Sequence, residues 1–219
     1  PDNVYAFDSG GDPAVIPDLT FEQFLTFHHS YYHPSNARIF FYGDDDPTKR
    51  LQLLDEYLKD FSAQPVDSAI ALQPYRSAPY RAELPYPAGE EPDQQKSFVT
   101  VNWLLPENSG AELTLALEIL SHILVGIPAS PLRKALIDSG LGEDVIGDGL
   151  DDGLRQLTFS IGLKGVLPEN SSRVEPLILD TLQTLATHGI ESDMVEAAIN
   201  TIEFKLREQN YGRFPRGLV

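Results

Sequence analysis

The stretch YYHPSNARIFFYGDDDP, residues 31–47, predicts the end of a helix, a buried strand, an acidic turn and the start of another helix. A helix should end before Pro34, because the residue that precedes a proline is disfavoured in the α region. The unbroken apolar run at residues 39–42 is typical of a strand that is buried on both faces. After Gly43, Pro47 suits the first position of a helix, because its missing N–H would be unpaired there. We therefore expect the neighbouring chain to pack around a central strand.

Helices are predicted on both sides of this strand. Thr20 and Gln23 have the spacing of a capping box, which marks a helix start. The second helix begins at Asp46 and Pro47, ends near Ser62 and should bury one apolar face. The residues expected on that face are Leu51, Leu54, Leu58 and Phe61.

A proline-rich region follows at residues 62–96 and predicts an interdomain linker, with a short strand at residues 80–84. Beyond it, residues 97–105 alternate between apolar and polar, which indicates a strand. A capping box at Ser109 and Glu112 predicts a helix that ends at Gly126. A shorter helix should run from Ser130 to Gly140.

The remaining chain predicts a hairpin and two closing helices. Residues 145–150 and 155–163 read as two antiparallel strands joined by an Asp-Asp-Gly turn. A helix over residues 170–187 should be capped by Gly189 and kinked or delayed by Pro176. The last helix is expected from Ser192 to about Tyr211. Together these elements predict an α+β fold, with helices on one face of mostly antiparallel sheet.

The composition is that of an ordinary globular chain with an excess of acidic residues. The chain has 219 residues, of which 42% are hydrophobic, and no cysteine, so disulfides, thiol catalysis and Cys-ligated zinc are excluded. Its 33 acidic and 16 basic residues argue against nucleic acid as a partner, because phosphate binding needs clustered Lys and Arg. No apolar run approaches the roughly 20 residues that cross a bilayer. We expect a soluble protein without a membrane partner.

The histidines offer weak evidence for a metal site. His29 and His33 stand four residues apart, a spacing that can bring two imidazoles onto one metal. A catalytic zinc needs three protein ligands, and neither H-E-x-x-H nor H-x-x-E-H occurs. The other histidines, His28, His122 and His188, add no ligand pattern. Ordinary histidines near a helix end are the favoured interpretation.

The acidic and glycine clusters do not match known ligand-binding loops. The aspartates at residues 44–46 and 148–152 lack the alternating oxygen ligands and distal Glu of a calcium loop. Turn formation and helix capping explain them more simply. The glycines at residues 140–149 lack the dinucleotide and P-loop spacings, and no G-x-S-x-G elbow provides a serine nucleophile.

Several blocks of the sequence resemble the presequence protease branch of the pitrilysin-type zinc metallopeptidases. They extend over essentially the whole chain with matching spacing. The blocks are DSGGDP (8–13), YYHPSNARIFFYGDDDP (31–47), NWLL (102–105), PASPLRKAL (128–136), SGLGED (139–144), SIGLKGV (160–166), NTIEFKLRE (200–208) and FPRGL (214–218).

The resemblance implies pitrilysin-like, metallohydrolase-like α+β domains. Members of this family are large peptidases whose four domains close around a chamber and cleave unstructured peptides, including transit peptides. Their inverted H-x-x-E-H motif holds zinc and activates water. By this resemblance the chain is an internal fragment, with the zinc motif before it and the substrate-binding Arg and Tyr after it. No catalytic or metal-binding residue is carried over, the substrate-binding residues stay unknown, and zinc is expected only in the full-length parent.

The same resemblance divides the chain. Residues 1–61 would close the first, catalytic-type domain, residues 62–79 would form a Pro-rich linker, and residues 80–219 would be most of the second domain. This part would form chamber wall and scaffold, with the remaining domains and unstructured, basic peptides as partners. A bacterial cytoplasm and an organelle matrix both fit. The alternative is a non-catalytic peptide-binding or assembly module of the same fold, in which an extended peptide adds to a sheet edge. A third hypothesis is a free-standing metal enzyme that uses His29 and His33.

Overall fold

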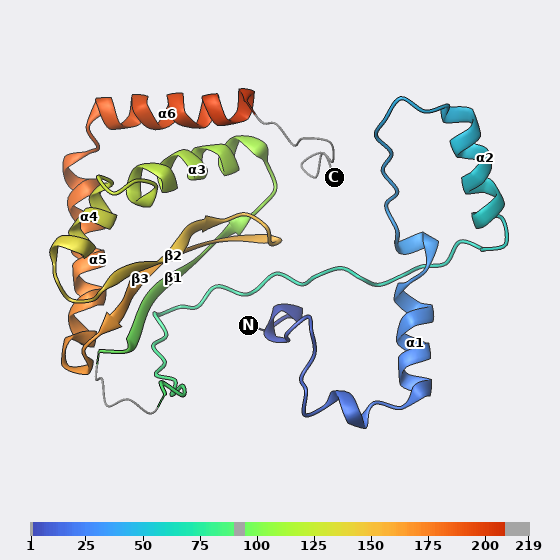
Figure 1. Cartoon of the computed structure of the whole chain (residues 1–219), viewed down its shortest axis with the longest axis horizontal. Helices are drawn as coiled ribbons and strands as arrows, with labels where there is room; N and C mark the ends of the chain where they lie inside the picture. Colours follow the sequence, from blue (N-terminus) through green and yellow to red (C-terminus); the bar gives the residue numbers. More distant parts are fainter. Residues whose placement is uncertain (1, 90–94, 209–219) are drawn as a thin grey trace. The chain divides into compact units, whose positions relative to one another are not determined.

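The computed structural model describes residues 2–89 and 95–208, which form two compact units that divide between Gln73 and Pro74 (Figure 1). The first unit contains two α-helices and short 3-10 turns, and the second contains a sheet with four helices. No helix in these two described stretches is long and apolar enough to cross a membrane.

The first unit contains the two predicted helices. Helix α1 (Phe21–Tyr31) begins with the expected capping box: the Thr20 hydroxyl accepts from the Gln23 N–H at 3.2 Å, and the Gln23 side chain accepts from the Thr20 N–H at 2.8 Å. The chain then makes a 3-10 turn at Pro34–Asn36, so the helix ends before Pro34 as predicted. Helix α2 (Pro47–Leu58) has Asp46 as its N-cap and Pro47 in its first position.

The predicted central strand at residues 39–42 is absent. These residues are extended, pair with no other described strand, and keep 43–70% of their surface exposed. A strand satisfies its backbone groups only through neighbouring strands. The rest of the described first unit contributes none, so the apolar run has neither the hydrogen-bonding partners nor the covering layers that its sequence requires.

The predicted burial along α2 is wrong for the same reason. Leu51 is 65% exposed and Phe61 52% exposed, while Leu54 and Leu58 are only half-buried. Neither α1 nor α2 contains a buried residue. An amphipathic helix is buried by what packs against it, and the described first unit has no layer opposite these faces.

The second unit is built on a three-stranded antiparallel sheet in the order β1-β3-β2. Strand β1 spans Ser97–Glu107, β2 spans Asp144–Asp151 and β3 spans Gln156–Val166. Trp103 pairs with Phe159 across β1 and β3, and Leu150 pairs with Phe159 from the other side. The predicted hairpin is confirmed, and the central strand of the described sheet is β3.

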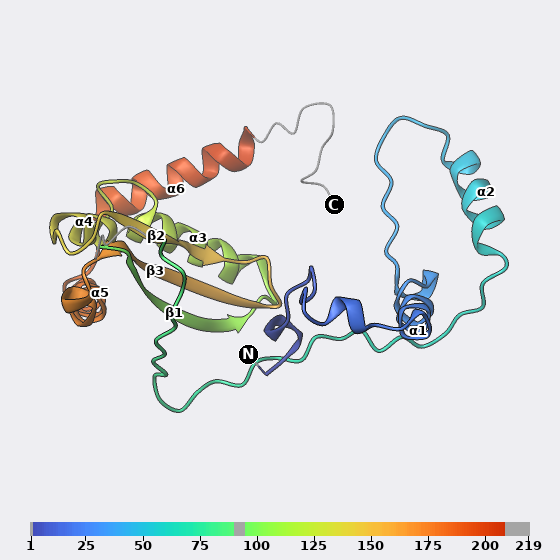
Figure 2. The same ribbon diagram turned by 60° about the horizontal axis from the view of Figure 1, so that its bottom comes forward.

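Four helices accompany this sheet (Figures 1 and 2). They are α3 (Ala111–Val125), α4 (Pro131–Asp138), α5 (Ser171–His188) and α6 (Ser192–Arg207). Helices α3 and α4 contact β2, α5 contacts β1 and β3, and α6 packs on α3. The predicted α+β class is confirmed.

One apolar core joins the sheet to α3, α4 and α5. Its fully buried side chains come from α4, β3 and α5 and are Leu132, Leu136, Ile161, Leu163, Val166, Val174 and Ile178. On β1 the alternate residues Val99, Val101 and Trp103 pack against it, as predicted. Burying a Leu or Ile side chain stabilises the fold by about 1.5–3 kcal/mol, so this core is the main source of stability in the described chain.

Some local predictions are corrected. Helix α3 starts after Gly110, which makes no side-chain cap, so the capping box predicted at Ser109 and Glu112 does not form. No strand exists at residues 80–84. Helix α5 begins at Ser171 and contains Pro176, so the proline does not delay its start. The predicted extension of the last helix to Tyr211 lies outside the described residues.

Candidate functional site

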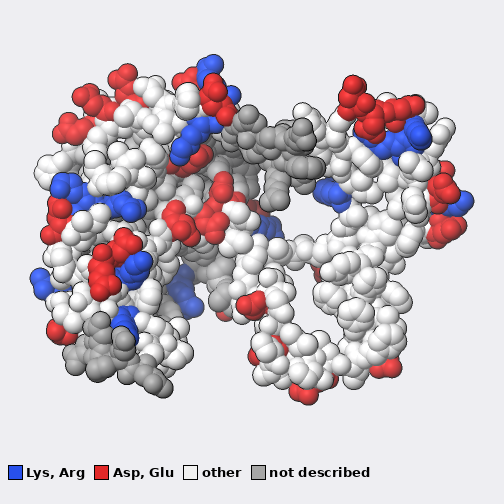
Figure 3. Space-filling view, viewed as in Figure 1, with Lys and Arg blue, Asp and Glu red and all other residues white. Residues whose placement is uncertain are grey.

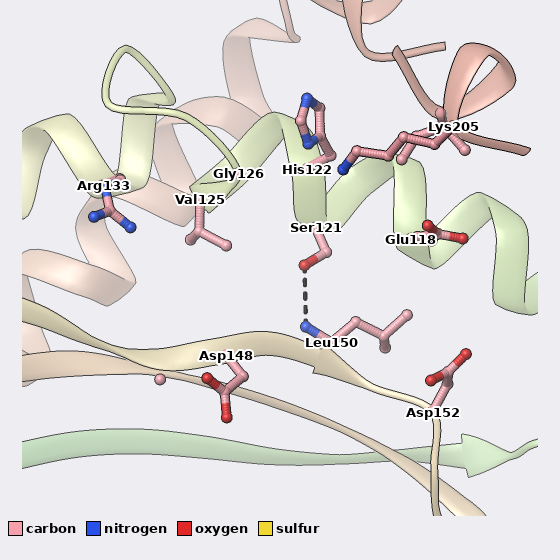
Figure 4. Close-up of a pocket in the computed structure, with 12 residues that line it drawn as sticks. Glu118, Ser121, His122, Val125, Gly126, Arg133, Asp148, Leu150, Asp152 and Lys205 are labelled. Atoms are coloured by element: carbon pink, nitrogen blue, oxygen red, sulfur yellow. Dashed lines mark hydrogen bonds between the residues drawn. The ribbon is translucent and has the colours of Figure 1, made fainter. Parts of the chain in front are cut away.

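A groove of about 490 Å³ lies between α3 and β2 (Figure 4). Within the described sheet β2 is an edge strand, because it pairs only with β3. The Ser121 hydroxyl of α3 accepts a hydrogen bond from the Leu150 backbone N–H at 3.0 Å. A side chain thus satisfies a backbone donor that faces away from β3. The groove is the main candidate site because it combines a cavity with an accessible strand edge.

Charged side chains of both signs line this groove. Glu118, Asp148 and Asp152 supply carboxylates, and Arg133 and Lys205 supply cations. None of the ion pairs in the described stretches joins these five side chains. Figure 4 shows Glu118 and Asp152 toward one end and Arg133 toward the other. The groove therefore suits a polar, charged chain better than an apolar ligand.

Arg133 is the least satisfied of these groups. Its Nε atom is buried and has no hydrogen-bond partner within the described chain. Its positive charge also contributes to lowering the pKa of Asp144, although the hydrogen bond from Lys164 is the largest cause of that shift. A buried N–H without a partner is costly, so Arg133 is the lining residue with the most to gain from a new acceptor.

The groove does not have the arrangement of a hydrolytic site. A serine nucleophile needs a base within hydrogen-bond reach, and the Leu150 N–H that bonds to the Ser121 hydroxyl oxygen is a donor, which cannot act as that base. The neighbouring His122 points away from it in Figure 4. Within residues 2–89 and 95–208, no three or more His, Cys, Asp or Glu side chains lie together in a way that could hold a metal.

The histidines singled out from the sequence have structural contacts. The His28 ring stacks on Tyr32 at a centroid distance of 4.9 Å. His33 precedes a 3-10 turn, where its Nδ1 accepts from the Ser35 N–H at 3.1 Å. His29 lines a separate shallow pocket with residues 64–67. With one imidazole nitrogen occupied and no third ligand nearby, the His29 and His33 pair does not fit a catalytic zinc.

The first acidic cluster has capping and pairing roles. Asp46 Oδ1 accepts from the Thr48 N–H at 2.9 Å at the start of α2, which confirms the predicted cap. Asp45 pairs with Arg50 through both carboxylate oxygens. That hydrogen-bonded pairing lowers the pKa of Asp45 below its usual value.

The second acidic cluster has one aspartate in the hairpin turn and two that line the groove. Near this cluster, Asp144 pairs with Lys164 on β3 at 3.2 Å, and this contact lowers the pKa of Asp144. Asp151 Oδ1 accepts from the Gly153 N–H at 2.9 Å, which stabilises the hairpin turn. Asp148 and Asp152 line the groove. Figure 3 shows acidic side chains over the second unit interspersed with basic ones, so this face is not uniformly acidic.

The glycines of β2 are required by close packing. The register shifts between Ile146 and Gly149, and Gly147 and Gly149 have φ values of 98° and 72°. A Cβ on Gly149 would stand 2.4 Å from the Ser121 hydroxyl oxygen. Glycine therefore lets α3 approach the strand closely enough for Ser121 to reach Leu150.

The sequence alone did not identify most of the groove. Glu118, Ser121, Arg133 and Lys205 come from α3, α4 and α6, and no short motif joins them. The sequence identifies Asp148 and Asp152 only as part of an acidic cluster that does not match a calcium loop. The predicted packing of helices on the sheet was the available signal, because it brings one of these helices against the hairpin.

Comparison with known proteins places this architecture in a family. The family model described as "Peptidase M16 inactive domain" matches residues 18–202. A protease from Helicobacter pylori has a similar solved structure, with a TM-score of 0.58 and 19% identity over 90% of this chain and 47% of that one. At that identity the structural likeness supports the fold alone.

Curated relatives share much more sequence. The chain is 55% identical to presequence protease 1, chloroplastic/mitochondrial, of Arabidopsis thaliana, over 100% of this chain and 21% of that protein. It is 39% identical to protein HypA of Clostridium perfringens, over 100% and 23%. It is 36% identical to the mitochondrial presequence protease of Mus musculus, over 96% and 21%. The chain thus spans about a fifth of the length of these relatives. It belongs to the peptidase M16 inactive domain family.

Proposed function

We propose that this chain is a non-catalytic part of a zinc metalloendopeptidase that degrades unstructured, transit-type peptides. The observation that carries the proposal is the 55% identity, over the whole chain, to a protein named presequence protease 1. The lack of a metal-ligand cluster in the described stretches is compatible with it. The chain forms part of a chamber wall and scaffold, and zinc is held by other parts of the full-length protein.

The division of the chain belongs to the same proposal. Residues 1–61 form the last part of a catalytic-type domain, residues 62–79 a linker, and residues 80–219 most of the next domain. The exposed apolar run at residues 39–42 supports this assignment, since its side chains need covering layers. Those layers come from the remaining domains of the parent, which are the main partners of the chain.

In this proposal the groove contacts peptide that lies against the wall. Its carboxylates Glu118, Asp148 and Asp152 attract the basic side chains of transit-type peptides, which are Arg-rich and poor in acidic residues. Arg133 and Lys205 donate hydrogen bonds to acidic groups or to the carbonyl oxygens of the peptide. Affinity is modest, because exposed charge pairs are each worth about 0.2–1 kcal/mol.

Removing the carboxylates of the groove tests this contact. The variant Glu118→Gln/Asp148→Asn/Asp152→Asn is compared with Glu169→Gln/Asp180→Asn/Glu196→Gln, which removes the same charge elsewhere in the second unit. Fluorescence anisotropy with a labelled basic amphipathic peptide should show up to about tenfold weaker binding for the groove variant alone. Equal weakening of both variants would contradict a role for the groove.

Zinc analysis and peptide digestion test the non-catalytic role. The purified chain should contain no stoichiometric zinc by inductively coupled plasma mass spectrometry, and it should leave the same peptide intact. In a chimera, this chain replaces the matching segment of the Arabidopsis protease, and peptide cleavage should be retained. An inactive but folded chimera would refute the wall role. Stoichiometric zinc in the purified chain would support the hypothesis of a free-standing metal enzyme that uses His29 and His33.

The alternative is a binding or assembly module of the same fold. The observation that favours it is that β2 pairs only with β3 in the described sheet, because a short extended peptide can add to a strand edge through main-chain hydrogen bonds even where the register is not continuous. The coding sequence upstream separates the two functions. An H-x-x-E-H motif there supports the peptidase, and its absence supports the module.

A further inference from the structure

A threefold tyrosine motif opens the second unit. Tyr75, Tyr80 and Tyr86 each follow a proline, within Pro-Tyr-Arg, Pro-Tyr-Arg and Pro-Tyr-Pro. The segment that carries them, residues 74–89, is extended and has no helix or strand. It belongs to the second unit. We call this segment the strap.

Both ends of the strap are bound to the first strand of the sheet. The Tyr75 hydroxyl donates to the carbonyl oxygen of Leu105, near the end of β1, at 3.1 Å. The Tyr86 hydroxyl donates to the carbonyl oxygen of Lys96, just before β1, and the Tyr86 ring stands edge-on to Phe98 with centroids 5.4 Å apart. The strap therefore runs in the opposite direction to β1.

The middle of the strap is bound to α5. The Arg81 guanidinium donates to both oxygens of Glu175, at 2.8 and 2.6 Å. This fork-to-carboxylate geometry is the most directional ion pair that side chains form. Figure 2 shows the strap passing alongside α5 and the start of β1. One charge pair thus connects the strap to the helix layer, while its tyrosines connect it to the sheet.

The strap is held by few contacts. Leu84 is 82% exposed and Tyr80 is 68% exposed, so little apolar surface is buried beneath them. Such a segment detaches locally at much lower free energy than a core element. Its position therefore depends largely on polar contacts, among which the bidentate pair joins it to α5.

We propose that the strap is a latch-controlled segment, in which the pair between Arg81 and Glu175 decides whether residues 74–89 stay attached to the sheet and α5. With the latch closed, the chain is attached to the second unit from Tyr75 onward. With the latch open, residues 74–89 detach and lengthen the chain that joins Gln73 to β1. Linker length sets how far and how often two joined parts meet. The latch thus regulates the length of this connection.

Tryptic cleavage measures how often the strap detaches, because Arg76 and Arg81 are cleavage sites within it. Limited digestion of the full chain, followed by mass spectrometry, gives a rate for each site. Cleavage of a rapidly opening segment follows the population of its open form. The variant Glu175→Gln should raise cleavage after both arginines by about two- to fivefold, which is the effect of losing one exposed ion pair.

The matched control is Asp180→Asn, which removes a carboxylate from the same helix without touching the strap. This variant should leave both cleavage rates unchanged. Cleavage after Lys59, in the first unit, should have the same rate in wild type and in both variants. High salt should raise the wild-type rates toward those of Glu175→Gln and leave the variant unaffected. Trp103 fluorescence confirms that each variant keeps its core.

Two results would overturn the proposal. Unchanged cleavage in Glu175→Gln would show that the pair does not hold the strap. A higher rate after Arg81 alone would show that the pair only shields that arginine and that the strap does not detach as a unit.

Discussion

At the scale of single residues, the second unit depends on a few polar groups placed inside an apolar core. Ser130 is 1% exposed, and its hydroxyl accepts from the Ile127 N–H and donates to the carbonyl oxygen of His122, both at 3.1 Å. These bonds join the end of α3 to the start of α4. The sequence predicted Ser130 as a helix start, but it did not predict this bridging role.

Removing this hydroxyl should destabilise the second unit. Ser130→Ala leaves the part-buried Ile127 N–H without its acceptor, which costs about 1–3 kcal/mol of unfolding free energy. Urea unfolding followed by Trp103 fluorescence measures the change. The exposed Ser109→Ala should stay within about 0.5 kcal/mol of wild type. Equal stability of the two variants would show that the bridge contributes nothing.

Gly149 offers a second test at this scale. Its φ of 72° already disfavours a side chain, and a Cβ would clash with the Ser121 hydroxyl. We expect Gly149→Ala to lower the unfolding free energy by about 2–3 kcal/mol, from backbone strain and loss of the Leu150 bond. Gly140 has a similar φ of 63° but open space around it, so Gly140→Ala should cost only the strain, about 1 kcal/mol. Similar losses in both variants would mean that the clash is relieved.

At the scale of elements, the helices and the hairpin were predicted closely, whereas the opening strand was not. Local patterns such as the Thr20 capping box and the alternation along β1 determine structure through nearby atoms. The strand predicted at residues 39–42 requires hydrogen bonds from distant chain, and the described residues supply none. The same contrast explains why α2 forms at its predicted position but does not bury its apolar face.

This contrast predicts how the isolated chain behaves. The double variant Phe40→Ser/Tyr42→Ser should reduce binding of the apolar dye ANS and raise solubility, because it removes exposed apolar surface. It should leave the Trp103 unfolding midpoint unchanged, since these residues contribute no core contact. Phe204→Ser, which changes an exposed aromatic of α6 in the second unit, is the control with a smaller effect on the dye. A lower midpoint in the double variant would show that residues 39–42 are packed.

The pairing between β2 and β3 has a predictable pH dependence. The pKa of Asp144 is lowered in the folded state, chiefly by its hydrogen bond from Lys164. Its contribution is therefore complete above the unfolded pKa, about 4, and is lost as pH falls through the lower folded value. The stability difference between wild type and Asp144→Asn should be constant from pH 7 to 5 and shrink below pH 4. A difference that is unchanged at pH 3 would contradict this pairing.

At the scale of the whole molecule, the charge, the fold class and the place of the core depend on different kinds of sequence information. The net charge of −17 is fixed by composition, and the α+β class by local patterns. The groove between α3 and β2 depends on how helices cross a sheet edge. The residues that line it therefore cannot be predicted from their spacing along the sequence. The fully buried side chains all lie in the second unit, although the sequence placed the organising strand in the first.

Calorimetry should show this imbalance. Globular proteins absorb about 0.7 kcal/mol per residue on unfolding near 60 °C. Because the described core is confined to the second unit, we expect a single transition with about two thirds or less of the enthalpy expected for 219 residues. It should coincide with the change in Trp103 fluorescence. A full enthalpy, or a second transition invisible to Trp103, would show a cooperative core in the first unit.

The bond between Ser121 and Leu150 also affects how copies of the chain would aggregate. Exposed strand edges act as templates on which other chains assemble into fibres. The edge of β2 is interrupted by an irregular register at residues 146–149, has one donor taken by a side chain, and carries Asp148. These features disfavour a second molecule in continuous register there. Fibre growth by the isolated chain would therefore begin at the apolar run of residues 39–42 and leave the edge of β2 free.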